Sequence, residues 1–219
     1  MSKTALIIVA HPDDEVVGVG GTILKLQREY GYTVHVQVMS YAPHEKKWDY
    51  FRKSSKILGF TTGFPIFTHT PNKLDEGCIN TLVGYITNIL NVLQPEVVFT
   101  HHLGDLHQDH RAVGEAVLIA TRPYPNQVVK KLYTFETAHT SEWNFGEFSK
   151  FEPNVYLDIS DYYKTKKEAL DIYKEEISLL EPEHPRSLAG VENSDLYRGF
   201  SVGLEKVESF KLVRSIDML

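Results

Sequence analysis

Short apolar runs alternate with longer helical stretches in the first part of the chain. Residues 6–10 (LIIVA) form one continuous apolar run, and residues 33–39 (TVHVQVM) alternate apolar with polar positions. Both patterns are typical of β-strands. Between them, apolar residues recur at helical spacing from Val16 to Tyr30, and Gly31 is placed to end that helix. The chain therefore opens with a predicted strand, helix and strand.

The alternation continues through residue 137. In chain order we predict a helix over 45–58 that stops at Gly59, a strand over 64–67, a helix over 79–93, a strand over 96–100, a helix over 113–120 and a strand over 132–137. Strands separated by helices of this length require right-handed crossovers and hence a parallel sheet covered on both faces. The sequence therefore predicts an α/β fold with a Rossmann-like, open, mostly parallel sheet and helices on both faces.

The pattern is less regular after residue 138. The candidate elements there are a strand in 154–160 (NVYLDIS), a helical stripe from Tyr163 to Leu180 and an edge strand in 208–216 (ESFKLVRSI). No internal repeat, low-complexity tract or linker separates this part from the rest. We expect a single domain over 1–219, with a regular βα core in 1–138 and an irregular elaboration in 139–219 that carries substrate loops and a sheet edge.

The bulk composition narrows the class of protein. The 219 residues suit one substantial domain, and a net charge of −6 with dispersed basic residues argues against a nucleic-acid partner. Cys78 is the only cysteine, which excludes a disulfide framework within the chain. The apolar run at residues 5–10 is too short for the core of a signal peptide, and no run reaches membrane-spanning length. We expect a soluble cytoplasmic protein with no integral membrane segment. The sequence leaves open whether it forms a homo-oligomer.

Histidines and acids gather directly after the first and fourth predicted strands. The first cluster is HPDDE at residues 11–15. The second is HHLGDLHQDH at residues 101–110, which contains four of the ten histidines. Ligands of open parallel sheets bind outside the carboxyl ends of the strands. If the first and fourth strands are neighbours, the two clusters face each other at this edge.

The two clusters contain the ligands of a catalytic metal site. His11 and Asp14 are three residues apart, and so are His107 and His110. Two histidines and one aspartate around an open position filled by water form a typical catalytic Zn²⁺ site, and such a set also accepts Fe²⁺. The residues alone leave open whether His107 or His110 is the third ligand.

The remaining residues of the clusters have chemistry to contribute. Asp13 lies beside both ligands of the first cluster and can accept a proton from the attacking water. His107 can donate a hydrogen bond to a developing oxyanion, and Asp109 can hold His107 in the required tautomer. Asp105 is a second acid available to orient a ligand. Each residue also has an ordinary alternative, because strand-terminal His and Asp residues commonly serve in turns or as helix caps.

Three motifs carry a resemblance to a known family. They are AHPDDE at residues 10–15, GVGG at 18–21 and HQDHRAV at 107–113. Together they resemble the LmbE-like, or PIG-L, family of zinc-dependent N-deacetylases, and the resemblance covers most of the chain. It implies removal of acetyl groups from N-acetylglucosamine-type sugars in glycolipid precursors and other glycans. A phosphate-binding loop is the competing interpretation of GVGG, but the segment lacks the G-x-G-x-x-G spacing.

The resemblance also implies a role for each matching residue. Position by position, it makes His11, Asp14 and His110 the zinc ligands, Asp13 the general base and His107 the residue that stabilises the oxyanion. It therefore favours His110 over His107 as the third ligand.

Substrate contacts are predicted outside the two clusters. Arg52 resembles the arginine with which the family contacts substrate, although Ser55 stands where the family often has an acid. HPRS at residues 184–187 resembles a branch of the family found with glycan assembly enzymes, and pockets often recruit loop residues of this kind. We therefore expect His184 and Arg186 to contact the substrate.

The expected function is hydrolysis of the acetamide of an N-acetylated amino sugar, free or in a glycan precursor, to the amine and acetate. A metal-dependent esterase or phosphodiesterase acting on a related glycan is one alternative, because a polarising metal and a base serve those bonds too. A catalytically silent sugar-binding protein is another. The presence of a full set of ligand and base residues favours an enzyme.

Overall fold

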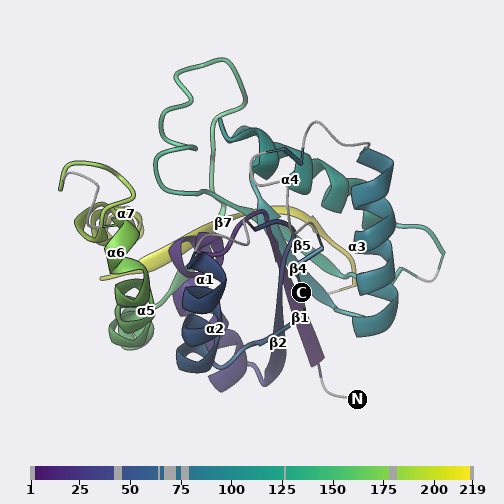
Figure 1. The fold of residues 1–219 in the computed structure, drawn as a ribbon, viewed down its shortest axis with the longest axis horizontal. Coiled ribbons are helices and arrows are strands. Elements are labelled where there is room, and N and C mark those ends of the chain that lie inside the picture. The colour runs from purple at the N-terminus through teal and green to yellow at the C-terminus, as the bar shows by residue number, and fades with distance from the viewer. Residues whose placement is uncertain are drawn as a thin grey trace.

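The computed structural model describes residues 3–41, 46–63, 65–66, 73–74, 79–125, 127–177 and 182–217 (Figure 1). The strands are β1 (Lys3–Val9), β2 (Tyr32–Val38), β3 (Thr61–Thr62), β4 (Val97–His101), β5 (Lys131–Phe135), β6 (Val155–Asp158) and β7 (Val207–Ser215). The helices are α1 (Asp14–Arg28), α2 (Lys47–Leu58), α3 (Ile79–Leu93), α4 (Gln108–Ala120), α5 (Tyr163–Leu170), α6 (Lys174–Ile177) and α7 (Leu188–Phe200). Most of them occupy the predicted places.

The strands form one sheet in the order β3-β2-β1-β4-β5-β7-β6. The pairs from β3 to β5 are all parallel, whereas β7 runs antiparallel to both β5 and β6. This confirms the predicted Rossmann-like, mostly parallel sheet. Because the chain leaves β1 toward β2 and leaves β4 toward β5, on opposite sides, the carboxyl ends of β1 and β4 form the switch point of the sheet.

Two helical layers cover the sheet (Figure 1). Alternate residues of β1 face opposite layers, because successive side chains of a strand point to opposite faces. Ala5, Ile7 and Val9 pack with residues of α1, α2 and α5, while Leu6 and Ile8 pack with α3 and α4. All five are fully buried. Burial on both faces explains why this strand is a continuous apolar run rather than an alternating one.

Helix α1, which begins within the first polar cluster at residues 11–15, is bent and is held by β7. The bend lies at Val19, whose backbone angles are not helical. The backbone N–H groups of Gly21 and Thr22 donate to the carboxylate of Glu208 at 2.9 and 2.7 Å. A Cβ atom on Gly21 would lie 2.7 Å from the Cβ atom of Ile159, so only glycine permits this approach. At this position the GVGG motif therefore serves the packing of α1.

A buried ion cluster extends this anchor. The Nζ atom of Lys166 in α5 lies 2.8 Å from Glu208 and 2.7 Å from Asp195 of α7, and its side chain is fully buried. Burial alone would lower the pKa of Lys166, but the two carboxylates raise it, so the ammonium keeps its charge. The cluster ties α5, α7 and β7 to α1, because Glu208 also accepts the backbone N–H groups of α1.

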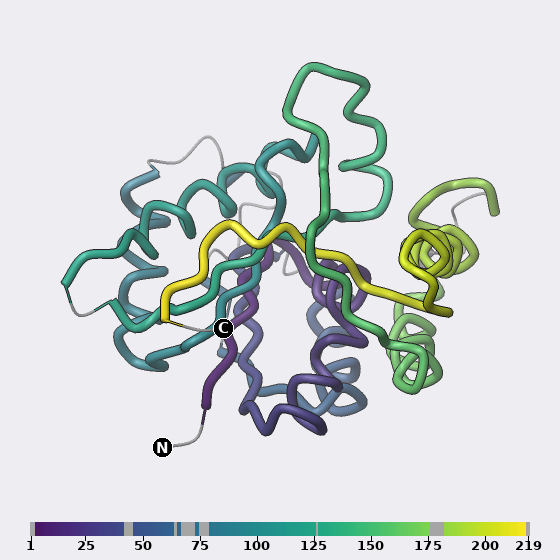
Figure 2. The backbone as a smooth tube through the Cα atoms, turned by 180° about the vertical axis from the view of Figure 1, so that it is seen from behind, coloured from purple at the N-terminus to yellow at the C-terminus, as the bar shows by residue number. Residues whose placement is uncertain are grey.

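The sheet differs from the prediction at two strands. The described residues of the predicted strand 64–67, Pro65 and Ile66, lie outside any strand, and the short β3 precedes them. Proline cannot donate to a strand ladder, which disfavours a strand there. The final strand, β7, is not at the edge: it lies between β5 and β6 (Figure 2). Residues 64 and 67 lie outside the described part of the chain.

The C-terminal helices also differ from the prediction. The stripe that begins at Tyr163 is divided into α5, a 3₁₀ turn at Asp171–Tyr173 and α6, and residues 178–180 lie outside the described part. Helix α7 was not predicted. It begins at Ser187, whose hydroxyl accepts the backbone N–H of Gly190, a common N-cap arrangement.

Two expectations from the sequence concerned membrane-spanning segments and the single cysteine. None of the helices in the described ranges is both long and apolar enough to cross a bilayer. Cys78 lies outside the described residues.

Candidate metal centre at the switch point

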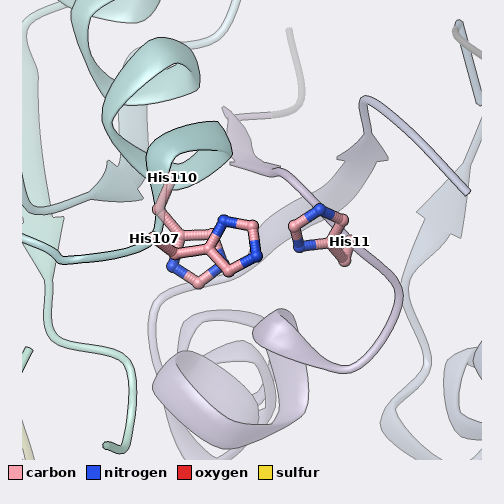
Figure 3. A group of neighbouring side chains, drawn as sticks. All are labelled: His11, His107 and His110. Carbon is pink, nitrogen blue, oxygen red and sulfur yellow. The ribbon is translucent and has the colours of Figure 1, made fainter. Parts of the chain in front are cut away.

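The two polar clusters meet at the carboxyl ends of β1 and β4. Ile7 of β1 pairs with Phe99 of β4, which sets the loop after β1 opposite the first turn of α4. Figure 3 shows His11 on that loop, facing His107 and His110 at the start of α4. The ring centroid of His107 lies 4.8 Å from that of His11 and 4.5 Å from that of His110. The predicted encounter of the two clusters is confirmed.

The carboxylate of Asp109 holds His11. Its Oδ2 lies 2.9 Å from Nε2 of His11, and its Oδ1 accepts the backbone N–H of Leu74 at 2.9 Å. Burial raises the pKa of Asp109, but the contact with His11 outweighs burial and lowers it, so Asp109 accepts and Nε2 of His11 donates. The Nδ1 atom of His11 then lies 3.6 Å from Asp14. The predicted contact of Asp109 with His107 is made through the backbone: the Asp109 N–H donates to Nδ1 of His107 at 3.2 Å, while the Asp109 carboxylate contacts His11 and Leu74.

His110 lies between two carboxylates. Its Nε2 is 3.4 Å from Oδ1 of Asp14, and its Nδ1 is 3.3 Å from Oδ1 of Asp105. Burial alone would lower the pKa of His110, but Asp14 and Asp105 raise it to about 10. The surroundings of this ring are therefore strongly negative and favour a positive charge, either a proton or a metal ion.

Asp105 connects this cluster to the loop that follows β5. Its fully buried carboxylate accepts the backbone N–H of His107 at 2.8 Å and the hydroxyls of Thr140 and Ser141 at 2.8 and 2.9 Å. Burial raises the pKa of Asp105, but the contact with His110 and the hydrogen bonds hold it at about 2. An ionised carboxylate next to a ligand-type imidazole is the arrangement that orients metal ligands.

His101 is enclosed by the protein. Its Nε2 accepts the backbone N–H of Ala10 at 3.0 Å, its Nδ1 lies 3.2 Å from the Thr137 hydroxyl, and its ring stacks on that of His110 at 4.0 Å. Burial, reinforced by the charge on His110, lowers the pKa of His101 to about 4. Because both ring nitrogens already have partners, His101 is suited to supporting the cluster.

His107 is the N-cap of α4. Its Nδ1 accepts the backbone N–H of Asp109 at 3.2 Å, which places the proton of the neutral ring on Nε2. Burial and the charge on His110 lower the pKa of His107 to about 4. A neutral imidazole with Nε2–H can donate to an oxyanion.

Asp13 occupies a strained turn between β1 and α1. Its φ of 111° lies in the left-handed region, which costs a residue with a side chain about 1–3 kcal/mol. Its Oδ2 contacts the Arg186 guanidinium and lies 3.7 Å from Nζ of Lys47. Its buried Oδ1 has no hydrogen-bond partner among the residues that the structure describes. A buried carboxylate oxygen without a donor is a candidate proton acceptor.

Glu15 supports the turn from inside the protein. It is fully buried, accepts the backbone N–H of Asp13 at 3.0 Å, and accepts the hydroxyl of Tyr173 at 3.2 Å. Burial and the charge of Asp13 raise the pKa of Glu15 to about 8. Sequence reasoning gave this residue no part in the site, because its partner Tyr173 is 158 residues away.

Two overlapping groups of side chains could hold a metal ion. One is His11, His107 and His110, and the other is Asp14, His101 and His110; within each group the ligand atoms lie within 4.8 Å of one another. His110 belongs to both. The set predicted from the motifs, His11, Asp14 and His110, draws on both groups. Imidazole and carboxylate donors in a buried, negative pocket fit a divalent cation such as Zn²⁺ or Fe²⁺.

The three predicted substrate contacts have different positions. Arg186 reaches Asp13, and His184 lies next to it, with Nδ1 accepting the Arg186 N–H at 3.1 Å. Arg52 is not brought to the cluster: its side chain is 61% exposed and pairs with Asp49 at 2.6 Å. Lys47, the first residue of α2, reaches Asp13 instead, with its Nζ 3.7 Å from Oδ2. This contact was not predicted from the sequence.

The fold and the site together define a Rossmann-like α/β protein with a candidate metal centre at the switch point of its sheet. Residues 6–121 match the family described as PIG-L, GlcNAc-PI de-N-acetylase. This range contains both polar clusters and more than half of the chain. The chain therefore belongs to the PIG-L family of deacetylases.

Curated relatives match most of the chain. The uncharacterised deacetylase YaiS of Escherichia coli (strain K12) is 29% identical over 180 residues, which cover 75% of this chain and 86% of YaiS. A probable N-acetyl-α-D-glucosaminyl L-malate deacetylase 2 of Bacillus anthracis is 26% identical over 190 residues, covering 78% of this chain and 80% of the relative.

Solved structures share the fold. The N,N′-diacetylchitobiose deacetylase of Pyrococcus horikoshii has a TM-score of 0.73 and 20% identity, covering 97% of this chain and 84% of that one. GalB, the 4-carboxy-2-hydroxymuconate hydratase of Pseudomonas putida KT2440, has a TM-score of 0.73 and 23% identity, covering 99% of both chains. The same fold thus carries a deacetylase and a hydratase, so the reaction has to be argued from the site.

Proposed function

We propose that the protein is a metal-dependent hydrolase that removes the acetyl group from an N-acetylated amino sugar of the GlcNAc type, free or in a glycan precursor. The family and the relative named as a glucosaminyl-malate deacetylase support this substrate class. The observation that carries the proposal is the contrast between two adjacent acids. Asp14 faces the histidines, whereas Asp13 keeps a buried oxygen without a donor among the described residues. Adjacent carboxylates in different environments suit different tasks.

His11, Asp14 and His110 are the proposed metal ligands, with zinc as the leading metal and iron(II) as the alternative. Asp109 orients His11 and Asp105 orients His110 through the contacts described above. When bound, the metal would lower the pKa of a water molecule toward about 7 and polarise the acetyl carbonyl.

Asp13 is the proposed general base. Arg186 and Lys47 both lie at its Oδ2, which fixes the carboxylate and leaves Oδ1 to accept a proton from the attacking water. The water oxygen bonds to the acetyl carbon, and the carbonyl oxygen becomes an oxyanion. The Nε2–H of His107 donates to this oxyanion. The amide C–N bond then breaks as Asp13 passes the proton to the amine nitrogen, which leaves acetate and a free amine.

Two other reactions use the same parts. Ester or phosphodiester hydrolysis needs the same base and metal. Addition of water to a carbon–carbon double bond is a further candidate, because GalB shares the fold. The products distinguish these reactions: acetate with an amine, an alcohol, a phosphomonoester, or a hydrated acid.

The test is incubation of the metal-loaded protein with a panel of N-acetylated and O-acetylated sugars and phosphodiesters, followed by mass spectrometry. We expect a loss of about 42 Da, one acetyl replaced by hydrogen, from N-acetylated sugars. The Asp13→Asn variant should lose about 10²- to 10⁴-fold in rate while it retains metal. Asp161→Asn, at an exposed acid, is the matched control. Alcohol or phosphate release without amine formation would reject the amidohydrolase in favour of its rivals.

A further inference from the structure

Three aromatic rings from two distant segments meet beside the candidate metal centre. Trp143 follows β5, and its ring centroid lies 5.3 Å from that of His139 and 5.1 Å from that of His184. The two histidine rings are 5.1 Å apart. We call Trp143, His139 and His184 the aromatic platform. Both imidazoles contact the indole edge to face, with interplanar angles of 82° and 76°. Trp143 is nevertheless 42% exposed.

The platform is joined to the proposed catalytic residues on two sides. His184 accepts the backbone N–H of Arg186, whose guanidinium contacts Asp13. On the other side, His139 directly precedes Thr140, which donates to Asp105 next to His110. The platform therefore borders the place where the acetyl group would be cleaved.

The loop that carries Trp143 is held firmly. The buried side chain of Asn144 donates to the carbonyl oxygens of Gly104, Phe148 and Ser149 at 3.0, 2.9 and 3.2 Å. A Cβ atom on Gly104 would lie 1.8 Å from the Ser149 oxygen, so the two loops are in direct contact there. The loop projects beyond the carboxyl edge of the sheet (Figure 2). The indole is thus positioned before any ligand arrives, which lowers the cost of binding.

His139 adds a second sign of constraint. Its φ is 71°, in the left-handed region, and such strain in residues other than glycine is found at ligand and active sites. Burial, reinforced by the nearby charge of Arg186, lowers the pKa of His139, so its ring is neutral at neutral pH. At His139 the platform therefore presents an uncharged aromatic ring.

A neighbouring aromatic residue shows that exposure by itself is not the argument. Phe145 is 89% exposed, and no described residue makes a ring or cation contact with it. Trp143, two residues earlier, has ring contacts with His139 and His184. Its backbone N–H donates to the His139 carbonyl at 3.0 Å. This difference makes Phe145 a matched control on the same loop.

We propose that the aromatic platform stacks against a second ring of the substrate, next to the N-acetylated sugar, so that the enzyme prefers glycosides or oligosaccharides over the free monosaccharide. An aromatic face binds the C–H face of a pyranose, while the hydroxyl groups remain at the edge. This inference rests on the proposed deacetylase function, because it assigns the second half of the same substrate.

The kinetic test compares two substrates of the metal-loaded enzyme: free N-acetylglucosamine and its β-1,4-linked dimer. For the wild-type protein we expect kcat/KM to be about tenfold higher for the dimer, an advantage equivalent to one good aromatic contact. Trp143→Ala should lose this advantage mainly through KM and leave the monomer rate nearly unchanged. Trp143→Phe should keep part of it, and Phe145→Ala should keep all of it. Equal losses for both substrates, or no loss for either, would overturn the platform.

A binding test separates failure of the platform from failure of the proposed function. The chain has two tryptophans, so the Trp48→Phe variant reports on Trp143 alone. Combined with Asp13→Asn, it should show a fluorescence change on titration with the dimer and a much weaker one with the monomer. If the wild-type protein releases acetate from neither sugar while this change persists, the deacetylase proposal fails on these substrates and the platform stands. If the fluorescence does not respond to the dimer, the platform is rejected whatever the activity.

Discussion

Nε2 of His11 lies 2.9 Å from Oδ2 of Asp109, although 98 residues separate them in the chain. This contact fixes which nitrogen of His11 faces Asp14 and joins the two halves of the candidate metal centre. Asp109→Asn keeps an oxygen for the Leu74 N–H but removes the charge that orients His11. We expect metal affinity to fall about 10- to 100-fold. Competition with a chelator measures this affinity, and Asp161→Asn serves as the exposed control. Unchanged affinity would show that His11 does not depend on Asp109 for metal binding.

The two histidines of α4 should separate into a ligand and an oxyanion residue. Metal content after desalting should collapse in His110→Gln, because its Nε2 faces Asp14. His107→Gln should retain the metal but lose about 10²- to 10³-fold in acetate release, which is the usual cost of removing an oxyanion donor. Elemental analysis together with an acetate assay measures both. If the two variants exchange these properties, the roles of His107 and His110 must be exchanged as well.

The strain at Asp13 should be measurable as stability. Asp13→Gly removes both the side chain from a left-handed backbone position and a buried carboxylate oxygen without a donor. Asp13→Gly and Asp13→Asn both lose the charge that pairs with the largely buried Arg186 and Lys47, so the strain is measured by comparing these two variants. We expect Asp13→Gly to have a free energy of unfolding about 1 kcal/mol higher than that of Asp13→Asn, while both lose activity.

Asp13→Asn provides the comparison, because it retains the strained backbone and removes only the charge. Urea denaturation of both variants measures the difference. If Asp13→Gly is no more stable than Asp13→Asn, the turn stores no strain that a glycine can relieve.

The buried cluster around Lys166 should control stability rather than chemistry. Lys166→Met leaves Asp195 and Glu208 buried without their cation, which should cost about 3–5 kcal/mol of unfolding free energy. Lys167→Met is the matched control, because that side chain is 49% exposed and should change stability by less than about 0.5 kcal/mol. Thermal denaturation compares the two. Similar melting temperatures would mean that the carboxylates find other partners or protons.

Periodicity was sufficient for the parallel half of the fold. The run at residues 6–10 and the stripes of α1 and α3 are long and regular, so burial on one or both faces is visible in the sequence. The final strand was recognised as a strand but placed at the edge. Its neighbours β5 and β6 are chosen by long-range pairing, which leaves no local pattern. Helix α7 was missed because only Val191, Asp195 and Gly199 of its residues are buried, too few for an apolar stripe.

The candidate site was likewise predictable only in part. The ligand-type residues could be predicted because HPDD and HQDH concentrate them within a few positions of two strand ends. The contacts between clusters could not, since the partner of Asp109 is decided by the approach of β1 to β4. Arg186 was expected to contact substrate, and its contact with Asp13 spans 173 residues, beyond the reach of any spacing argument.

The position of β7 bears on how the chain reaches its native state. Residues 131–135 of β5 keep one row of backbone hydrogen-bonding groups unpaired until residues 207–215 have been synthesised and inserted. During translation the nascent chain therefore carries an open strand edge while roughly seventy further residues are added. Glu208, which secures the bend of α1, arrives with that last strand. In the finished sheet β5 is paired on both sides, by β4 and β7, so this edge is open to pairing with another chain only during synthesis.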